Sequence, residues 1–180
     1  SKDYFQPGCG SVRYLHEGMR IVHRDIKLEN ILRHESGIWK VCDFGLAEYQ
    51  DEDAADAEIV GGSLAYCSTE QLRSNRPLRR PLSDIWSLGV VLYAFLTNKL
   101  PFQDEYEPRL QLQTLNGRYE DLTDSSTGAR DLLKNALRAK PADRWRIGQV
   151  RDSSWCLEIS STDLESNNKP NLYSPFRSAL

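Results

Sequence analysis

The stretch VHRDIKLEN, residues 22–30, sets an aspartate, Asp25, between an arginine and a lysine, and an asparagine, Asn30, follows five positions later. The stretch from 21 to 30 is too polar and too short for a helix, so we expect a loop. That loop brings a carboxylate, an ammonium group and an amide close together. Such a set is suited to a reaction in which charge develops on the substrate.

Phosphoryl transfer is a reaction that uses these groups. It requires metal ions that gather phosphate charge, a carboxylate that orients the attacking hydroxyl group, and a cation near the transferred group. Asp25 can accept the hydroxyl proton, and Lys27 would project from the same loop toward the γ-phosphate. Asn30 offers Mg²⁺ a neutral oxygen ligand, and Asp43, in the later stretch CDFG, offers a charged one. The sequence therefore predicts Asp25 and Lys27 as catalytic residues and Asn30 and Asp43 as metal ligands.

These motifs resemble those of eukaryotic protein kinases. H-R-D-x-x-x-x-N at 23–30, followed by D-F-G at 43–45, is similar to the catalytic loop and the metal-binding loop of that family. The lysine two positions after Asp25 is the one that serine/threonine kinases carry. The resemblance implies transfer of the γ-phosphoryl group of ATP, with Mg²⁺ as the metal, to serine or threonine hydroxyl groups of proteins. It also implies that His23 is a packing residue and not a base.

Three later motifs continue the resemblance in the order that the family has them. GGSLAYCSTE at 61–70 resembles the substrate-binding loop, SDIWSLGVVLY at 83–93 the central buried helix, and KPADRW at 140–145 the segment with a late arginine. The short stretch between Gly117 and Gly128, which has no long insertion, and the stretch GVVLYAFLTNKLPF are most similar to the calmodulin-dependent and AMP-activated branch. A chance match of all five motifs in this order is negligible.

The resemblance assigns structural roles to three residues of the later motifs. Asp84 is expected to hold the backbone of the turn at 23–24. Arg144 is expected to form a buried ion pair with Glu70, and breaking such a pair typically costs ~3–5 kcal/mol. The proline of the usual Ala-Pro-Glu motif is missing, because this sequence reads Ser68-Thr69-Glu70. The glutamate itself is kept.

The family pattern places five residues around the bound nucleotide: Lys27, Glu29, Asn30, Cys42 and Asp43. Cys42 would line the floor of the nucleotide pocket, with a small buried hydrophobe without reactivity as the alternative. Glu29 lies where basophilic kinases carry a glutamate that contacts a substrate arginine. We therefore expect protein substrates in which a basic residue precedes the target hydroxyl group.

The loop after the D-F-G motif is acidic. In related kinases, the arginine at the position of Arg24 binds a phosphate group on this loop. Here, however, the sequence between Asp43 and Gly62 contains no serine or threonine. Glu58 stands near the usual position of the phosphothreonine and is a candidate partial mimic of it. A merely solvated acidic loop is the alternative. Ser63 is expected to help select serine or threonine over tyrosine.

Several parts of the family pattern are missing from these 180 residues. There is no G-x-G-x-x-G-x-V phosphate loop, no V-A-I-K strand lysine and no helix glutamate to pair with that lysine. The expectation is a fragment or truncated gene product in which the N-terminal lobe is absent. Such a chain would be inactive or weakly active alone and would need that lobe in cis.

Two other functions stay open. One is a pseudokinase that acts as a scaffold or regulator. Loss of kinase activity in evolution usually removes a catalytic or metal-binding residue, whereas Asp25, Lys27, Asn30 and Asp43 are all present here. Small-molecule phosphotransferases, which share a catalytic aspartate and asparagine, are the other. The motifs at 61–70, 83–93 and 140–145 disfavour them.

Composition and charge exclude several classes of protein. The sequence is 39% hydrophobic and 27% charged, which is ordinary for one globular domain. The net charge of -3 gives no reason to expect nucleic acid or an anionic membrane as a partner. The four cysteines lack the spacing of zinc ligands, and the longest apolar run, 85–96, is too short to span a bilayer. We expect an intracellular protein of the cytoplasm or nucleus.

The hydrophobic pattern predicts an α+β fold that is mainly helical, with a small β element around the catalytic loop. By resemblance this is the large C-terminal lobe of a protein kinase, over 1–156. Residues 157–180, rich in Ser, Asn and Pro, are expected to form a disordered tail. The expected elements are an interrupted helix within 1–20 that places Val12, Leu15 and Met19 on one face, strands at 31–32 and 39–42 joined by a turn at 36–37, and helices over 81–96 and 128–139.

Overall fold

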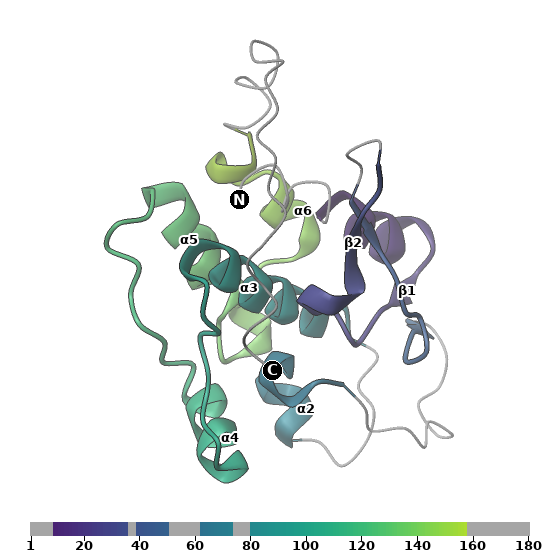
Figure 1. The fold of residues 1–180 in the computed structure, drawn as a ribbon. Coiled ribbons are helices and arrows are strands. Elements are labelled where there is room, and N and C mark those ends of the chain that lie inside the picture. The colour runs from purple at the N-terminus through teal and green to yellow at the C-terminus, as the bar shows by residue number, and fades with distance from the viewer. Residues whose placement is uncertain (1–8, 36–38, 51–61, 74–79, 158–180) are drawn as a thin grey trace.

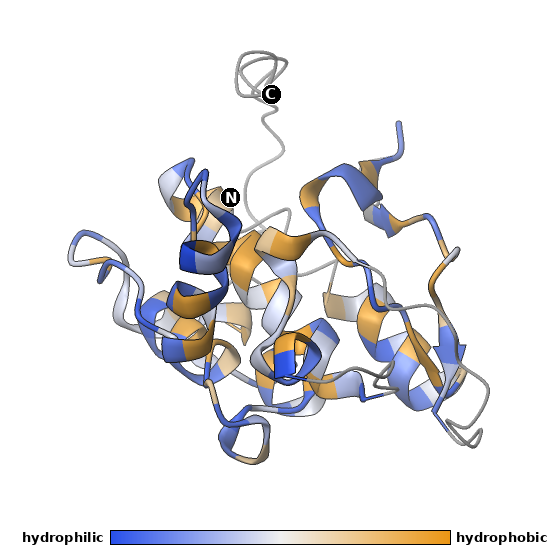
Figure 2. Ribbon diagram, turned by 90° about the horizontal axis from the view of Figure 1, so that it is seen from below, coloured by the Kyte–Doolittle hydropathy of each residue, from blue (hydrophilic) through white to orange (hydrophobic). Residues whose placement is uncertain are grey.

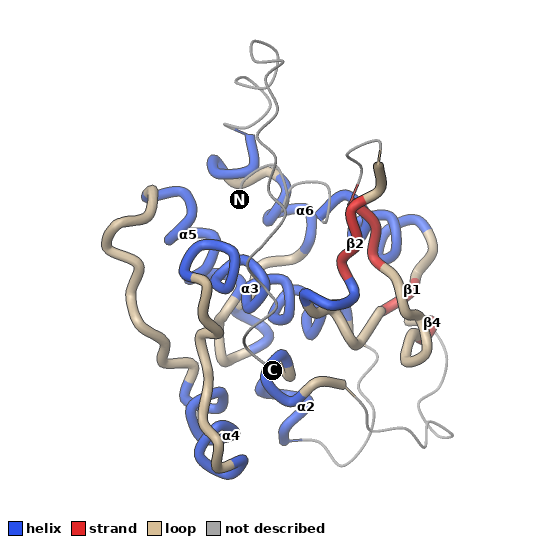
Figure 3. Tube along the Cα trace, in the orientation of Figure 1, coloured by secondary structure: helices blue, strands red, loops and turns tan. Residues whose placement is uncertain are grey.

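The structure, a computed structural model, describes residues 9–35, 39–50, 62–73 and 80–157. Figure 3 shows the described strands on one side of the molecule and helices over the rest of it. The strands are β1 (Ile21–Val22), β2 (Ile31–Arg33), β3 (Trp39–Val41) and β4 (Glu48–Tyr49). The α-helices with assigned bounds are α2 (Thr69–Arg73), α3 (Pro81–Thr97), α4 (Glu107–Asn116), α5 (Thr127–Ala136) and α6 (Ile147–Arg151). Shorter helical turns cover Tyr14–Gly18, Leu28–Asn30, Leu64–Tyr66 and Pro141–Asp143.

Helix α3 runs through the middle of the molecule (Figure 1) and is the scaffold on which the other elements pack. Pro81 occupies its first turn, where the missing N–H group leaves no hydrogen bond unmade. Every residue from 83 to 94 is buried, as the apolar sequence of this helix predicts. The helix ends at Asn98, which adopts the left-handed conformation with φ 61° and donates its N–H to the Ala94 carbonyl.

Helix α5 packs against α3 at Gly89. Its buried positions, Ala129, Leu132, Leu133 and Ala136, follow the helical spacing expected from the sequence. Ser126 caps the helix, because its Oγ accepts the Ala129 N–H at 3.3 Å. On α3, a Cβ atom added to Gly89 would lie 2.9 Å from Leu137 Cδ2 and 3.0 Å from Ala136 Cβ. Glycine is therefore required for this close approach.

The strands form two antiparallel pairs. The β2–β3 pair, with Ile31 opposite Val41, confirms the two predicted strands, whereas the predicted turn at 36–37 lies outside the described residues. The β1–β4 pair, with Val22 opposite Glu48, corrects the expectation of a loop over the whole of 21–30. These strands are two residues long, which is too short to leave a recognisable alternation in the sequence.

The N-terminal helical segment is described from residue 9 onward, and it changes from an α-helix to a wider π-helical turn at its end. Residues 9–13 are α-helical, and Tyr14–Gly18 forms a π-helical turn in which Met19 donates its N–H to the Tyr14 carbonyl. Val12 and Leu15 are buried, as expected, but Met19 is 42% exposed. The expectation for Met19 was wrong because the extra residue in a π turn rotates the following side chain away from the core face.

Aromatic side chains fill the centre of the core. Trp86 and Trp155 are almost fully buried, and Trp86 stacks on Phe102 with ring centroids 5.4 Å apart. Figure 2 shows hydrophobic and hydrophilic residues alternating along the helices, as amphipathic packing requires. Within the described ranges, no helix combines the length and the apolar character needed to cross a membrane.

Candidate active site

The buried carboxylate of Asp84, in the first turns of α3, organises the backbone that precedes Asp25. Its Oδ2 accepts the His23 N–H and its Oδ1 accepts the Arg24 N–H, both at 2.8 Å. These are the contacts expected from the sequence. They hold Arg24 at φ 70°, in the left-handed region that non-glycine residues rarely adopt. The direction in which the chain enters Asp25 is therefore fixed from α3.

His16 is a third partner of Asp84, and the sequence analysis missed it. Its Nε2 lies 2.7 Å from Asp84 Oδ2, and both side chains are buried. Because a carboxylate only accepts, the Nε2–H group must donate this hydrogen bond. The single signal in the sequence was a histidine next to Leu15, on a helix with apolar positions. That local pattern could not predict a contact with Asp84, 68 residues later in the sequence.

His23 uses both ring nitrogens to hold the catalytic loop. Its Nε2 lies 3.0 Å from the Cys42 carbonyl, which can only accept, and its Nδ1 receives the Asp25 N–H at 3.3 Å. The ring also packs edge-on against Phe44, with centroids 5.0 Å apart. The side chain is fully buried, so this geometry supports the packing role and not that of a base.

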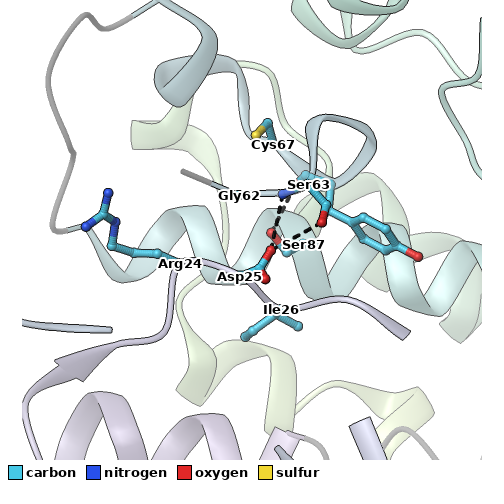
Figure 4. A pocket seen from close by; sticks show the side chains of 8 residues that line it. Arg24, Asp25, Ile26, Gly62, Ser63, Cys67 and Ser87 are labelled. Carbon is cyan, nitrogen blue, oxygen red and sulfur yellow. Dashed lines mark hydrogen bonds between the residues drawn. The ribbon is translucent and has the colours of Figure 1, made fainter. Parts of the chain in front are cut away.

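Asp25 lies where three donors meet. Its Oδ2 is 2.7 Å from Lys27 Nζ and 3.2 Å from Asn30 Nδ2. Its Oδ1 accepts the Ser63 N–H at 3.2 Å. Figure 4 shows the Asp25 side chain pointing toward Ser63, across the gap between the catalytic loop and the later segment. The structure thus brings together four residues that are spread over 39 positions of sequence.

These donors determine the charge of the site. Burial raises the pKa of the Asp25 carboxyl, but the hydrogen bonds from Lys27 and Ser63 lower that pKa by more, so it lies below its ordinary value. The hydrogen bond to Asp25 in turn raises the pKa of the Lys27 ammonium. The pair is therefore ionised at neutral pH. A carboxylate with a lowered pKa is a weak base, and it is better suited to orient a hydroxyl group than to deprotonate it in advance.

The segment that begins with Gly62 and Ser63 approaches the catalytic loop closely. Gly62 has φ 126°, and a Cβ atom there would lie 3.3 Å from the Arg24 carbonyl oxygen. Ser63 Oγ accepts a hydrogen bond from Lys27 Nζ at 3.1 Å and lies 3.4 Å from Asp25 Oδ1. The Ser63 hydroxyl therefore lies beside both charged groups.

The predicted metal ligands lie on adjoining segments. Asn30 Nδ2 donates to the Asp25 carbonyl at 2.9 Å, so the atom of this side chain that could accept a metal is its oxygen. The Cys42 N–H donates to the Asn30 carbonyl at 2.9 Å and so ties Asn30 to the residue before Asp43. Asp43 is exposed, has φ 63°, and accepts the Gly45 N–H on Oδ1.

These oxygen donors fit Mg²⁺, which prefers hard ligands and completes its shell with phosphate and water. In the part of the chain that the structure describes, no group of three His, Cys, Asp or Glu side chains could hold a metal by itself. A Mg²⁺ ion at the two predicted ligands would therefore need phosphate or water oxygens to complete its shell.

The remaining predicted residues lie around this centre. Cys42 is partly exposed, and its Sγ donates to the Asn30 carbonyl at 3.4 Å. Glu29 is exposed in the turn Leu28–Asn30 and acts on Tyr66, whose pKa is raised to about 12 by burial first and by the charge of Glu29 second. Glu58 lies outside the described residues.

The ion pair between Glu70 and Arg144 joins α2 to the end of the domain. Arg144 Nη1 lies 2.7 Å from Glu70 Oε1, and Nη2 lies 3.0 Å from Oε2, a bidentate geometry. The guanidinium also donates to the Leu82 and Arg138 carbonyls and lies 5.0 Å from the Trp86 ring centroid. Burial raises the pKa of Glu70, but the hydrogen bonds and charge of Arg144 lower it by more.

Arg24 has an anionic partner that the sequence analysis did not identify. Its Nη1 lies 2.7 Å from Oε1 of Glu48, with 3% of the arginine and 19% of the glutamate side chain exposed. Both residues are near the site in sequence, but only the pairing of β1 with β4 brings them together.

Comparisons with known proteins find related sequences. The sequence profile of the protein kinase domain matches residues 1–156. The probable serine/threonine-protein kinase MARK-C of Dictyostelium discoideum is 31% identical over 100% of this chain and 22% of its own length. A probable serine/threonine-protein kinase KIN1 homolog of Encephalitozoon cuniculi is 36% identical over 84% of this chain and 26% of its own length. The mitosis inducer protein kinase cdr1 of Schizosaccharomyces pombe is 36% identical over 94% of this chain and 29% of its own length. The chain therefore spans about a quarter of the length of these relatives.

Proposed function

This chain belongs to the protein kinase family, and we propose that it supplies the catalytic and protein-substrate side of a serine/threonine kinase. The observation that carries the proposal is the Asp25 carboxylate, held between Lys27, Asn30 and the Ser63 N–H at 2.7 to 3.2 Å. Phosphoryl transfer depends on positioning and electrostatic stabilisation more than on covalent chemistry, and this cluster is suited to both.

Asp25 would orient the serine or threonine hydroxyl of the protein substrate. The hydroxyl oxygen forms the new bond to the γ-phosphorus, the bond from that phosphorus to the leaving ADP oxygen breaks, and the hydroxyl proton passes to the carboxylate. Lys27 would lie beside the transferred group, where its ammonium offsets the negative charge that surrounds the phosphorus. Ser63, next to both groups, would help admit a small aliphatic alcohol.

Asn30 and Asp43 are the residues that would hold Mg²⁺, and Lys27, Glu29 and Cys42 would border the nucleotide. When bound, MgATP supplies the phosphoryl group and a metal that gathers its charge. The contribution of this chain is to hold the side-chain oxygen of Asn30 and the carboxylate of Asp43 on segments joined by the hydrogen bond from the Cys42 N–H to the Asn30 backbone carbonyl.

We further propose that residues 1–180 by themselves bind MgATP weakly and do not phosphorylate a peptide detectably. The sequence contains no glycine-rich phosphate loop and no V-A-I-K lysine, the parts that cover and anchor the phosphates in this family. A small lobe that supplies them in cis would complete the site. The half-exposed side chains of Leu32, two positions after Asn30, and of Phe44, directly after Asp43, are consistent with such a cover.

The exposed carboxylate of Glu29 supports a preference for a basic residue before the target hydroxyl group. The absence of a disulfide among the four cysteines and the proposed use of ATP support an intracellular place of action, in the cytoplasm or nucleus.

The test is phosphorylation of matched peptides by the complete protein that carries this chain. Three peptides would present serine, threonine or tyrosine after an arginine, and a fourth would present serine after a glutamate. Mass spectrometry after incubation with MgATP should find phosphate on the serine and threonine peptides and least on the acidic one. Binding of MgATP without any phosphopeptide would instead favour a pseudokinase. Transfer to tyrosine alone would contradict the proposed substrate.

A further inference from the structure

Arg24, the residue directly before Asp25, carries a buried charge. Only 3% of its side chain is exposed. A buried guanidinium requires anionic partners, because an uncompensated charge is costly away from water. Figure 4 shows its side chain pointing away from Asp25, so the catalytic carboxylate remains with Lys27. The Arg24 charge is met by Glu48, at 2.7 Å.

Backbone pairing places the Glu48 carboxylate next to the catalytic loop. Glu48 lies opposite Val22 in the β1–β4 pair, and the Gln50 N–H extends the pairing by donating to the Arg20 carbonyl at 2.8 Å. Strand β1 leads directly into the catalytic loop, and β4 lies five positions after Asp43. The ion pair therefore connects the two segments that carry the catalytic aspartate and the exposed metal ligand.

Arg24 is anchored at both ends. Asp84 Oδ1 accepts its N–H at 2.8 Å and holds its backbone at φ 70°, while Glu48 holds its guanidinium. A conformation in this region persists in a non-glycine residue only when its surroundings fix it. Since Asp25 is the next residue, release of one anchor would loosen the carboxylate that orients the substrate.

We propose that Glu48 is a positioning residue of the phosphoryl-transfer site, which fixes the catalytic loop against the segment after Asp43 through its ion pair with Arg24. Its effect on rate rests on the proposed kinase function. The charge belongs to the chain itself, so the pair forms on folding and needs no added phosphate. In line with this, the sequence between Asp43 and Gly62 contains no serine or threonine to receive one.

The principal test is Glu48→Gln in the complete protein, which keeps the shape of the side chain but removes its charge. We expect kcat for a serine peptide to fall about ten- to hundredfold, because a small misplacement of a catalytic group has effects of this size. The KM for the peptide should change little, since Glu48 would touch no substrate. Glu17→Gln is the matched control: Glu17 also pairs with an arginine, Arg13, at 2.7 Å, but 49% and 46% of these two side chains are exposed. Its kcat should equal that of the wild type.

A double-mutant cycle separates pairing from general damage. The loss caused by Glu48→Gln should shrink in an Arg24→Gln background, because the ion pair that Glu48→Gln removes is already absent there. Treatment of the wild type with a serine/threonine phosphatase should leave its activity unchanged. If Glu48→Gln does not fold, a folded Arg24→Gln/Glu48→Gln protein supports the pairing. If the double variant does not fold although Arg24→Gln alone does, the proposed pairing is wrong.

Amide hydrogen exchange gives a readout that does not depend on activity. Exchange within residues 22–30 should be faster in Glu48→Gln than in the wild type and unchanged in Glu17→Gln. A wild type that phosphorylates no peptide counts against the proposed function, and the exchange rates then decide this inference. A Glu48→Gln protein with wild-type kcat and wild-type exchange overturns it.

Discussion

The ammonium group of Lys27 lies 2.7 Å from Asp25 Oδ2 and 3.1 Å from Ser63 Oγ, so one cation joins the catalytic loop to the segment after Gly62. The pKa values of the two charged groups move in opposite directions: Lys27 lowers the pKa of Asp25, and Asp25 raises that of Lys27. Both groups therefore stay charged over a wide range of pH around neutrality.

Replacing Lys27 by methionine in the complete protein should lower kcat by about a hundredfold, because one preorganised donor is lost where charge is transferred. It should also move the acid limb of the pH–rate profile to higher pH. The sign follows from the pKa of Asp25, which is lowered by the hydrogen bond and charge of Lys27 and must rise when they are removed. The exposed Lys99→Met is the control for loss of a lysine. An acid limb that stays in place in Lys27→Met would refute this coupling.

Replacing Glu70 by glutamine should lower the free energy of unfolding by about 3–5 kcal/mol, because Arg144 would be left buried without its anion. Urea denaturation measures the change. Asp143→Asn provides the comparison: its pair with Lys140 spans 4.0 Å, with 58% and 74% of the side chains exposed. That substitution should change the free energy by no more than about 0.5 kcal/mol. Equal effects of the two variants would show that burial of the pair contributes nothing.

The same ion pair predicts how stability depends on pH. The pKa of Glu70 in the folded protein lies below its ordinary value of 4.5. Its contribution is therefore fully present above that value and is lost as the pH falls through the lower, folded-state pKa. The difference in unfolding free energy between wild type and Glu70→Gln should be constant near neutrality and narrow under acid conditions. A difference that widens on acidification would reverse the sign and contradict the assignment.

Gly89→Ala should destabilise the protein by about 1–3 kcal/mol, because the new methyl group would overlap Leu137 and Ala136 where α3 meets α5. Gly10→Ala is the matched substitution. It also lies in a helix, but a Cβ atom there meets nothing within 4 Å. Its stability should be equal or higher by up to about 1 kcal/mol, from helix propensity. Thermal unfolding distinguishes the two, and a neutral Gly89→Ala would mean that the helices can separate without cost.

The sequence predicted those parts of the site that depend on short spacing. Asp25, Lys27 and Asn30 lie on one loop, so their positions in the sequence already require them to be neighbours. Helix α3 was also predicted from the sequence, because its residues are apolar on nearly every side. The buried Glu70–Arg144 pair was foreseen by resemblance, since no local pattern connects residues 74 positions apart.

Contacts that depend on tertiary arrangement were not predicted. Glu48 was not singled out from the loop expected after the D-F-G motif, because strands of two residues carry no periodic signal. His16 reaches Asp84 only once the N-terminal helix packs against α3. Helix α4 was missed for a different reason: within Glu107–Asn116 only Leu110 and Thr114 are buried, so its apolar face is too narrow to recognise.

The most direct test of the account is the rate of phosphoryl transfer by Asp25→Asn in the complete protein, measured with saturating MgATP and a serine peptide. Asparagine keeps the size of the side chain but cannot accept the hydroxyl proton. The account predicts a loss in kcat of about a hundredfold or more, with a KM for the peptide close to that of the wild type. Asp131→Asn, on the exposed side of α5, should retain full activity. A kcat of Asp25→Asn that equals the wild-type value would contradict the role of Asp25 and, with it, the proposed active site.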